Sequence, residues 1–319
     1  MASDYYNEWE TSRIRADCDL FPIIRKVVTY MSYAAQKRIL LFCFLFFPVA
    51  LLLLFLVWPT VRMVYYSFTN WDGVLPEFKF IGISNYIRVF NEPLLWISLK
   101  NNLVYAVVGF IQNIVAIFFA VILNSRMRGR VFYKTVIFLP YVLNVTATAY
   151  MFSFLYDYRE GPINLMMRAL GREPIKFFSD SDIVIYSLAF ISFWRWLGYS
   201  MILYISALQS IDPELYEASS IDGANSLQKF RFITFPGIIR VIELQLFLAL
   251  SGSLRAFTES IILTKGGPGK ASYTFLYYII DAYSRYNDYG YAAAMSVSLV
   301  IIIIVIAGIQ QLVIRRGED

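Results

Sequence analysis

Four charged side chains stand inside otherwise apolar stretches, and they are the residues best placed to do chemistry. Arg195 lies between two tryptophans in FWRWLGYS, while Glu243, Arg255 and Glu259 share one later stretch. A charge at the centre of an apolar helix costs about 2.5 to 3.5 kcal/mol on insertion scales, so each needs a partner or a function. Together with Tyr199, these residues are our candidates for a polar substrate pathway.

Two interpretations of these charges stay open. Arg255 and Glu259 are four residues apart, so on one continuous helix they would share a face and neutralise each other. Alternatively, Arg195 and Tyr199 line a cavity for a hydroxylated solute, because aromatic faces stack on sugar rings and polar groups bind hydroxyls. An arginine would also suit a carboxylated sugar.

The composition argues against an enzyme. The chain has no histidine, which removes histidine-based triads, general bases and most zinc sites. Its two cysteines, Cys18 and Cys43, lie in a polar segment and an apolar one, so neither a disulfide framework nor a metal cluster is indicated. The basic residues behind the net charge of +5 are scattered, unlike a nucleic-acid-binding stripe. We therefore expect no catalytic residue, no metal and no nucleic acid partner.

The elements that must position these residues are membrane-spanning helices. The chain has 319 residues, of which 58% are hydrophobic and 16% charged. A span needs about 20 mostly apolar residues. Six segments qualify, and they predict an all-α membrane protein with six transmembrane helices at residues 39–58, 99–123, 136–156, 183–208, 238–263 and 291–313.

Residues 1–38 and 39–319 are expected to form different regions. The second is the transmembrane domain. The first is a cytoplasmic segment in which PIIRKVVTYMSYAAQKR, beginning at Pro22, has the apolar spacing of an interfacial helix, although an ordinary lead-in helix fits equally well.

Orientation follows from the loop NSRMRGRVFYK, which carries four basic residues and no acid: Arg126, Arg128, Arg130 and Lys134. Short loops rich in Lys and Arg stay in the cytoplasm. With six spans, both termini are then cytoplasmic as well, and so is the polar segment between spans four and five.

That polar segment, EASSIDGANSLQKFRFITFPGI, is predicted to form two short helices. Asp212 and Pro213 are a strong helix start, since the aspartate caps free N–H groups and proline suits the first turn. Gly223 should end this helix in a left-handed conformation. Asn225 or Ser226 then caps a second short helix, which Pro236 should end. A solvated loop would satisfy the topology too, but the rigid ends favour a docking element.

Three motifs in this segment carry a resemblance. Glu217-Ala218-Ser219, Asp222-Gly223-Ala224 and, after nine residues, ITFP resemble the EAA loop of permease subunits in ABC-type, binding-protein-dependent importers. Ser219 and Phe235 depart from the usual alanine and leucine. From about residue 39 onward the chain resembles the carbohydrate-uptake branch, notably at WRWLGYSMILYISALQSIDPELYEA and ILTKGGPGKASYTF. Within it, importers of alginate oligosaccharides are the suggested group.

The resemblance implies how such a chain works. The short cytoplasmic helix is a coupling helix that sits in a cleft of an ATPase, with Glu217 making a polar contact and Gly223 allowing the bend. The implied coupling residues are Glu217, Ala218, Ser219, Asp222, Gly223, Ala224, Leu227 and Phe230. The implied partners are a homologous second permease, two ATPases that hold ATP and magnesium, an extracytoplasmic solute-binding protein, a carbohydrate and the bilayer of a bacterial inner membrane.

This chain is expected to bind no ATP, because GGPGKAS only mimics a phosphate-binding loop. Thr264 stands at the first glycine position and Ala271 replaces the hydroxyl residue. The rival function is an ion-coupled secondary transporter with Glu243, Arg255 and Glu259 as a relay. The seven tyrosines between residues 273 and 291 are expected to form an interfacial aromatic belt rather than a sugar-facing surface.

Overall fold

The computed structural model describes residues 33–125 and 127–315. The expected interfacial helix that begins at Pro22, Cys18 and the last basic residue, Arg316, lie outside the described residues. The chain divides into two compact units, residues 1–62 and 63–319, and each is described by itself.

The described part of the first unit, residues 33–62, is a single helical rod. It contains α3 (Tyr33–Leu52), a π-helical turn (Leu53–Val57) and the start of α4 (Trp58–Tyr66). Its side chains from residue 40 onward are almost all exposed and apolar, as expected of a helix that meets hydrocarbon. The first predicted span is confirmed within the membrane-length helix Leu40–Tyr66.

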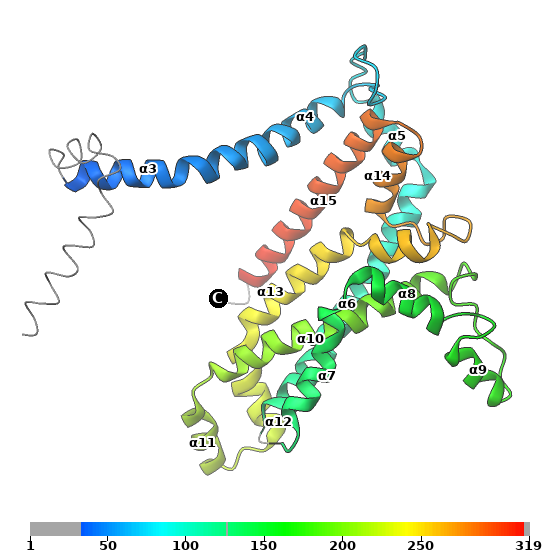
Figure 1. Cartoon of the computed structure of the whole chain (residues 1–319). Coiled ribbons are helices and arrows are strands. Elements are labelled where there is room, and N and C mark those ends of the chain that lie inside the picture. The colour runs from blue at the N-terminus through cyan, green and yellow to red at the C-terminus, as the bar shows by residue number, and fades with distance from the viewer. Residues whose placement is uncertain (1–32, 126, 316–319) are drawn as a thin grey trace, which may run out of the picture. The chain divides into compact units, whose positions relative to one another are not determined.

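The second unit is built on four long helices, which Figure 1 shows: α6 (Pro93–Asn124), α10 (Val184–Gln209), α13 (Phe235–Leu254) and α15 (Tyr289–Arg315). All four are long and apolar enough to cross a membrane. Helix α6 is central, because α10 and α13 both pack extensively on it. The buried residues shared by α6, α10 and α13 include Ala116, Tyr204 and Ile238.

The third predicted span, 136–156, is not one straight helix. It is α7 (Arg130–Val142) followed by α8 (Val145–Leu155), with a bend of 101° between them. The cause is Asn144, whose side chain accepts hydrogen bonds from the backbone N–H groups of Thr146 and Ala147 and so starts a new helix. The described residues thus hold five continuous membrane-length helices, or six if this bent pair counts as one span.

The fifth predicted span, 238–263, has other ends. The helix begins at Ser226, runs through a π-helical turn (Phe230–Thr234) and ends at Leu254. The expected stop at Pro236 is therefore wrong. The π turn accommodates the missing proline donor, because Phe235 N–H bonds the Phe230 carbonyl and the bonding register shifts ahead of the proline.

The far end of this helix breaks where a span was expected to continue. Arg255 adopts a non-helical conformation, and a short π-helical segment (Ser260–Thr264) follows after a gap. Asn102 on α6 holds the break, since its amide donates to the Ser253 carbonyl and its oxygen accepts from Phe275 N–H at the start of α14 (Phe275–Ser284).

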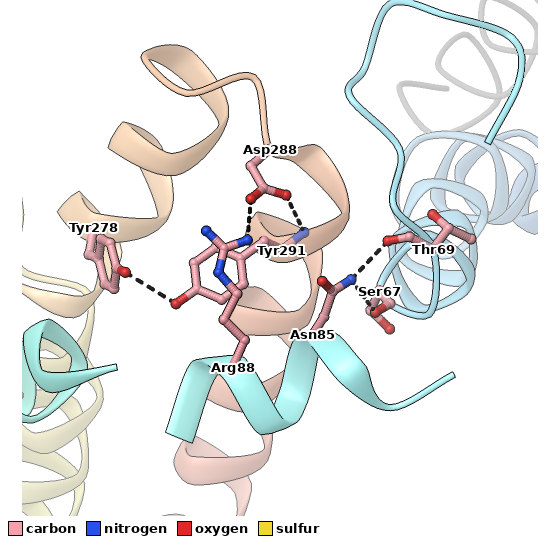
Figure 2. Close-up of polar contacts among 7 residues, drawn as sticks. All are labelled: Ser67, Thr69, Asn85, Arg88, Tyr278, Asp288 and Tyr291. Atoms are coloured by element: carbon pink, nitrogen blue, oxygen red, sulfur yellow. Dashed lines mark hydrogen bonds and ion pairs between the residues drawn. The ribbon is translucent and has the colours of Figure 1, made fainter. Parts of the chain in front are cut away.

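A polar cluster fastens the end of the second unit where α15 begins, as Figure 2 shows. Asn85, on the short helix α5 (Ser84–Asn91), donates to the carbonyls of Ser67 and Thr69. One turn later, Arg88 pairs with Asp288 and lies over the Tyr291 ring, 4.0 Å from its centroid. These contacts join the connection between α4 and α6 to the first turn of α15.

The tyrosines near this end do not form the expected belt. Four of the seven are buried in the core beneath α14 and α15: Tyr273, Tyr277, Tyr278 and Tyr291. Burial raises the pKa of Tyr277 above its usual range, with the Asp281 carboxylate adding to the shift. Spacing alone could not separate core tyrosines from interfacial ones, because both kinds lie on amphipathic elements.

Candidate functional site

A cavity of about 620 Å³ lies among α6, α7, α10 and α13, with the segment after α13 closing one side. Its lining brings together four of the five predicted pathway residues, Arg195, Tyr199, Arg255 and Glu259, from two stretches of sequence. Glu243 is not part of the lining. Its backbone carbonyl instead accepts a hydrogen bond from the Gln310 side chain.

One wall of the cavity is aromatic. The rings of Tyr141 on α7 and Tyr199 on α10 stack with centroids 4.9 Å apart, and Trp196 lies 5.4 Å from Tyr141 and 5.7 Å from Tyr199. Trp196 remains 43% exposed, so one of its surfaces faces open space rather than protein. Such a wall offers flat π surfaces to the apolar faces of a sugar ring.

The ion pair in the cavity is not the one that the shared helix face predicted. Because α13 ends at Leu254, Arg255 and Glu259 do not lie on one continuous helix, and that predicted pairing is wrong. Glu259 is buried and its Oε1 lies 3.6 Å from Nη1 of Arg195 on α10. Arg255 Nε donates to the Ser251 carbonyl, 3.1 Å away, in the last turn of α13. The ion pair therefore joins two elements, and only a tertiary contact could reveal it.

Several buried polar atoms of the lining lack a hydrogen-bond partner. They are Nε2 of Gln245, the hydroxyl of Tyr105 and Nε of Arg195. An unpaired buried donor costs about 1 to 3 kcal/mol, so these atoms favour a ligand that supplies hydroxyl groups. Sequence reasoning missed Gln245 and Gln112, although an amide inside an apolar stretch was a usable signal.

The second predicted site, the polar segment between α10 and α13, begins as expected. Helix α11 (Pro213–Ile221) starts behind Asp212, whose side chain accepts from Glu214 N–H. Gly223 has φ +78°, and the following Ala224 N–H bonds the Ser219 carbonyl at 2.9 Å. The predicted left-handed glycine turn is present.

The next helix, α12 (Ser226–Lys229), is also capped as predicted. Asn225 accepts from Gln228 N–H, and the Gln228 side chain accepts from Asn225 N–H. This reciprocal capping box fixes the start of the long helix that becomes α13. Sequence reasoning identified the cap, but the second helix is the first turn of a membrane-length helix rather than a separate short one.

Two contacts hold α11 against the start of this long helix. The Tyr216 hydroxyl hydrogen-bonds Thr234 Oγ1 at 2.9 Å, and Lys229 Nζ donates to Ser220 Oγ at 2.6 Å. These contacts tie α11 to the long helix that continues into α13, which lines the cavity. The segment, called the lever below, is therefore a hydrogen-bonded pair of helices rather than slack chain.

The predicted coupling residues divide by exposure. Glu217, Ala218, Asp222, Gly223 and Leu227 are exposed, while Ser219, Ala224 and Phe230 are half-buried. Phe230 packs near Phe235 of its own helix, with ring centroids 6.4 Å apart. Sequence reasoning missed Ile221, which is 87% exposed, while Leu227 is 75% exposed. An apolar side chain this exposed on a polar turn is available to a partner.

A polytopic helical chain with an internal polar cavity and a stiff helix pair linked to its wall defines a membrane transport subunit. The family described as "Binding-protein-dependent transport system inner membrane component" matches residues 112–318. The chain belongs to this family: it is a multi-pass permease subunit of an inner membrane, and it functions with a binding protein.

The sequence is similar to those of curated permeases over most of its length. It is 32% identical to the probable ABC transporter permease protein YurN of Bacillus subtilis (strain 168), over 89% of this chain and 99% of the relative. It is 31% identical to the arabinooligosaccharides transport system permease protein AraP of Halalkalibacterium halodurans, over 78% of this chain and 79% of the relative. Members of this family are permease subunits whose ATPase is a separate subunit, so the chain is a transport component, and the ion-coupled secondary transporter is disfavoured.

The fold also matches a solved structure. A subunit of a bacterial ABC transporter involved in the import of the acidic polysaccharide alginate superposes with a TM-score of 0.79 at 22% identity, covering 88% of this chain and 96% of that one. This likeness concerns the arrangement of the helices. The ion-coupled relay loses its geometric basis as well, since Glu243 lies outside the cavity lining and Arg255 does not share a helix face with Glu259.

Proposed function

We propose that this permease moves a carbohydrate through the cavity and forms half of the pathway with a homologous second permease. The observation that carries the proposal is the cavity lining. The lining combines a stacked aromatic wall with buried polar atoms without partners, on Gln245, Tyr105 and Arg195. That combination matches a solute with apolar ring faces and hydroxyl edges. Relatives named as arabinooligosaccharide permeases support the same class, and alginate oligosaccharides stand within it.

The energy source in this proposal is a pair of separate ATPases that bind ATP and magnesium. Each ATPase would grip one permease at the exposed residues of α11 and its following turn, including Glu217, Asp222, Ile221 and Leu227. Closure of the ATPases then moves α11, and the Tyr216 and Lys229 contacts carry the motion to α13. An extracytoplasmic binding protein delivers the sugar at the opposite end of the spans.

Purification tests this assembly. The chain, tagged and extracted gently with its genomic neighbours expressed beside it, should bring down an ATPase, a second permease and a solute-binding protein. In proteoliposomes, sugar-loaded binding protein should stimulate ATP hydrolysis and uptake. Recovery of the chain without any nucleotide hydrolase, or uptake that follows an ion gradient while ATP is absent, would contradict the proposal.

The proposed orientation places α11 and both termini in the cytoplasm. A cysteine at Asp222 should react with a membrane-impermeant maleimide only after the membrane is opened, while a cysteine at Lys270, in the loop after α13, should react in intact cells. Cys18 and Cys43 are replaced by serine in both variants to give a clean background. The reverse pattern would overturn the orientation and with it the coupling role of α11.

A further inference from the structure

The charge of the cavity is not balanced. Its lining holds two arginines, Arg195 and Arg255, against one carboxylate, Glu259, which gives a net charge of +1. Glu259 Oε1 lies 3.6 Å from Arg195 Nη1, so the one carboxylate already forms an ion pair with Arg195. No ion pair to Arg255 occurs among residues 33–125 and 127–315. One cation of the cavity lining, Arg255, is left without a counter-charge within the described residues.

An arginine without a counter-charge beside apolar helices is uncommon, so the position of Arg255 needs a reason. Part of the reason is local, because Arg255 follows the last residue of α13 and its Nε donates to the Ser251 carbonyl. A cation suits a helix C-terminus. That bond uses only the Nε–H, however. The two terminal nitrogens carry the fork of donors that matches a carboxylate, and Arg255 is an exposed residue that belongs to the cavity lining.

The aromatic wall lies in the same cavity as this guanidinium. Tyr141, Trp196 and Tyr199 provide ring faces, and Gln245 provides an amide without a hydrogen-bond partner. A neutral sugar would satisfy the rings and the amide but would leave the charge of Arg255 unmatched. A sugar acid satisfies all three features at once.

We propose that Arg255 is the residue through which this cavity selects carboxylated sugars, that is, uronic acids or oligosaccharides that contain them. The proposal rests on the carbohydrate function proposed above and narrows its substrate class. It derives from the charge balance of the lining and from the position of Arg255 at the break after α13. Arg195 does not serve this purpose, because Glu259 already neutralises it.

The test uses the complete transporter in proteoliposomes with its own binding protein. The probes are a uronate oligosaccharide and the neutral oligosaccharide of the same length made by reducing its carboxyl groups. Uptake and stimulated ATP hydrolysis are measured for wild type, Arg255→Gln and Arg255→Lys. Arg172→Gln is the matched control, since it removes an arginine from an exposed turn outside the cavity. Co-purification of the partners shows that each variant assembles.

We expect the wild type to favour the uronate. Arg255→Gln should raise the half-saturating uronate concentration by about 10-fold to 100-fold, the range for loss of a charge-assisted hydrogen bond. It should lower the response to the neutral sugar less than the response to the uronate. Arg255→Lys should recover part of the uronate response, because it keeps the charge but loses the fork. Arg172→Gln should behave as the wild type.

The contrary outcomes are distinct. Equal use of both sugars by the wild type, or an equal loss of both in Arg255→Gln, would overturn the acid selectivity while leaving carbohydrate transport intact. Loss of assembly in Arg255→Gln but not Arg255→Lys would show that Arg255 pairs with a carboxylate of the second permease, which also overturns the proposal. No response to either sugar in the wild type would instead refute the carbohydrate function itself.

Discussion

Gly223 offers the sharpest test of the lever formed by α11 and α13. Its φ of +78° lies in the left-handed region, and a Cβ placed there would meet no other atom within 4 Å. A substitution therefore acts through backbone strain and not through a clash. For an L-residue that strain is about 1 to 2 kcal/mol, and a β-branched side chain is especially unsuited to this region. Gly223→Val should populate the bent turn about 5-fold to 30-fold less than the wild type.

The assay is sugar uptake per ATP hydrolysed in the reconstituted transporter. Gly223→Val should lower uptake in proportion to the lost turn, because α11 no longer presents its exposed residues at the correct angle to α13. Gly223→Asn is the matched control, since asparagine tolerates the left-handed region and adds a side chain of similar size. Normal uptake by the valine variant, or an equal loss in the asparagine variant, would refute the reasoning, because backbone conformation would then not be the cause.

Three further predictions follow from single contacts. Asn225→Ala should cost about 1 kcal/mol of local helix stability, measured as faster hydrogen exchange in α12. Asn225→Ser keeps a capping oxygen and should exchange as slowly as the wild type. Equal exchange rates in the two variants would contradict the capping role. Arg195→Gln should leave Glu259 buried and unpaired and lower the free energy of unfolding in detergent by about 3 to 5 kcal/mol. Adding Glu259→Gln should restore most of this loss. A double variant whose loss equals the sum of the two single losses would show that the two residues do not interact. Arg88→Leu should loosen the 67–91 connection by no more than about 1 to 2 kcal/mol, measured by protease cleavage of that segment, and unchanged cleavage would show that the contact with Tyr291 is not stabilising.

Local rules explain why parts of the structure could be predicted. Asp212-Pro213, Gly223 and Asn225 each act on neighbouring backbone groups, so their roles can be read within four residues of the chain. The long apolar stretches can be recognised in the same way, because a helix that crosses the hydrocarbon core needs a continuous apolar segment whichever helices it packs against. The pathway candidates came from charges within such apolar stretches, whereas the coupling residues came from the resemblance to the EAA loop.

The failures come from competition between local signals. Asn144 capped a new helix and bent the expected third span, and the π turn before Pro236 carried a helix through a residue that usually ends one. Tyr273 and Tyr291 belong to the core although their spacing fits an interface. In each case two structures were locally acceptable, and packing chose between them.

The sequence by itself determined that this chain crosses a membrane several times, where its polar lever begins and bends, and which charges had to be accounted for. Only the tertiary structure decided that Arg195 rather than Arg255 neutralises Glu259, and that Tyr141 and Gln245 share a cavity with them. The physical reason is range. Backbone capping and hydrophobic transfer act within a few residues, whereas a charge in a cavity is matched by whatever side chain the packed helices bring beside it.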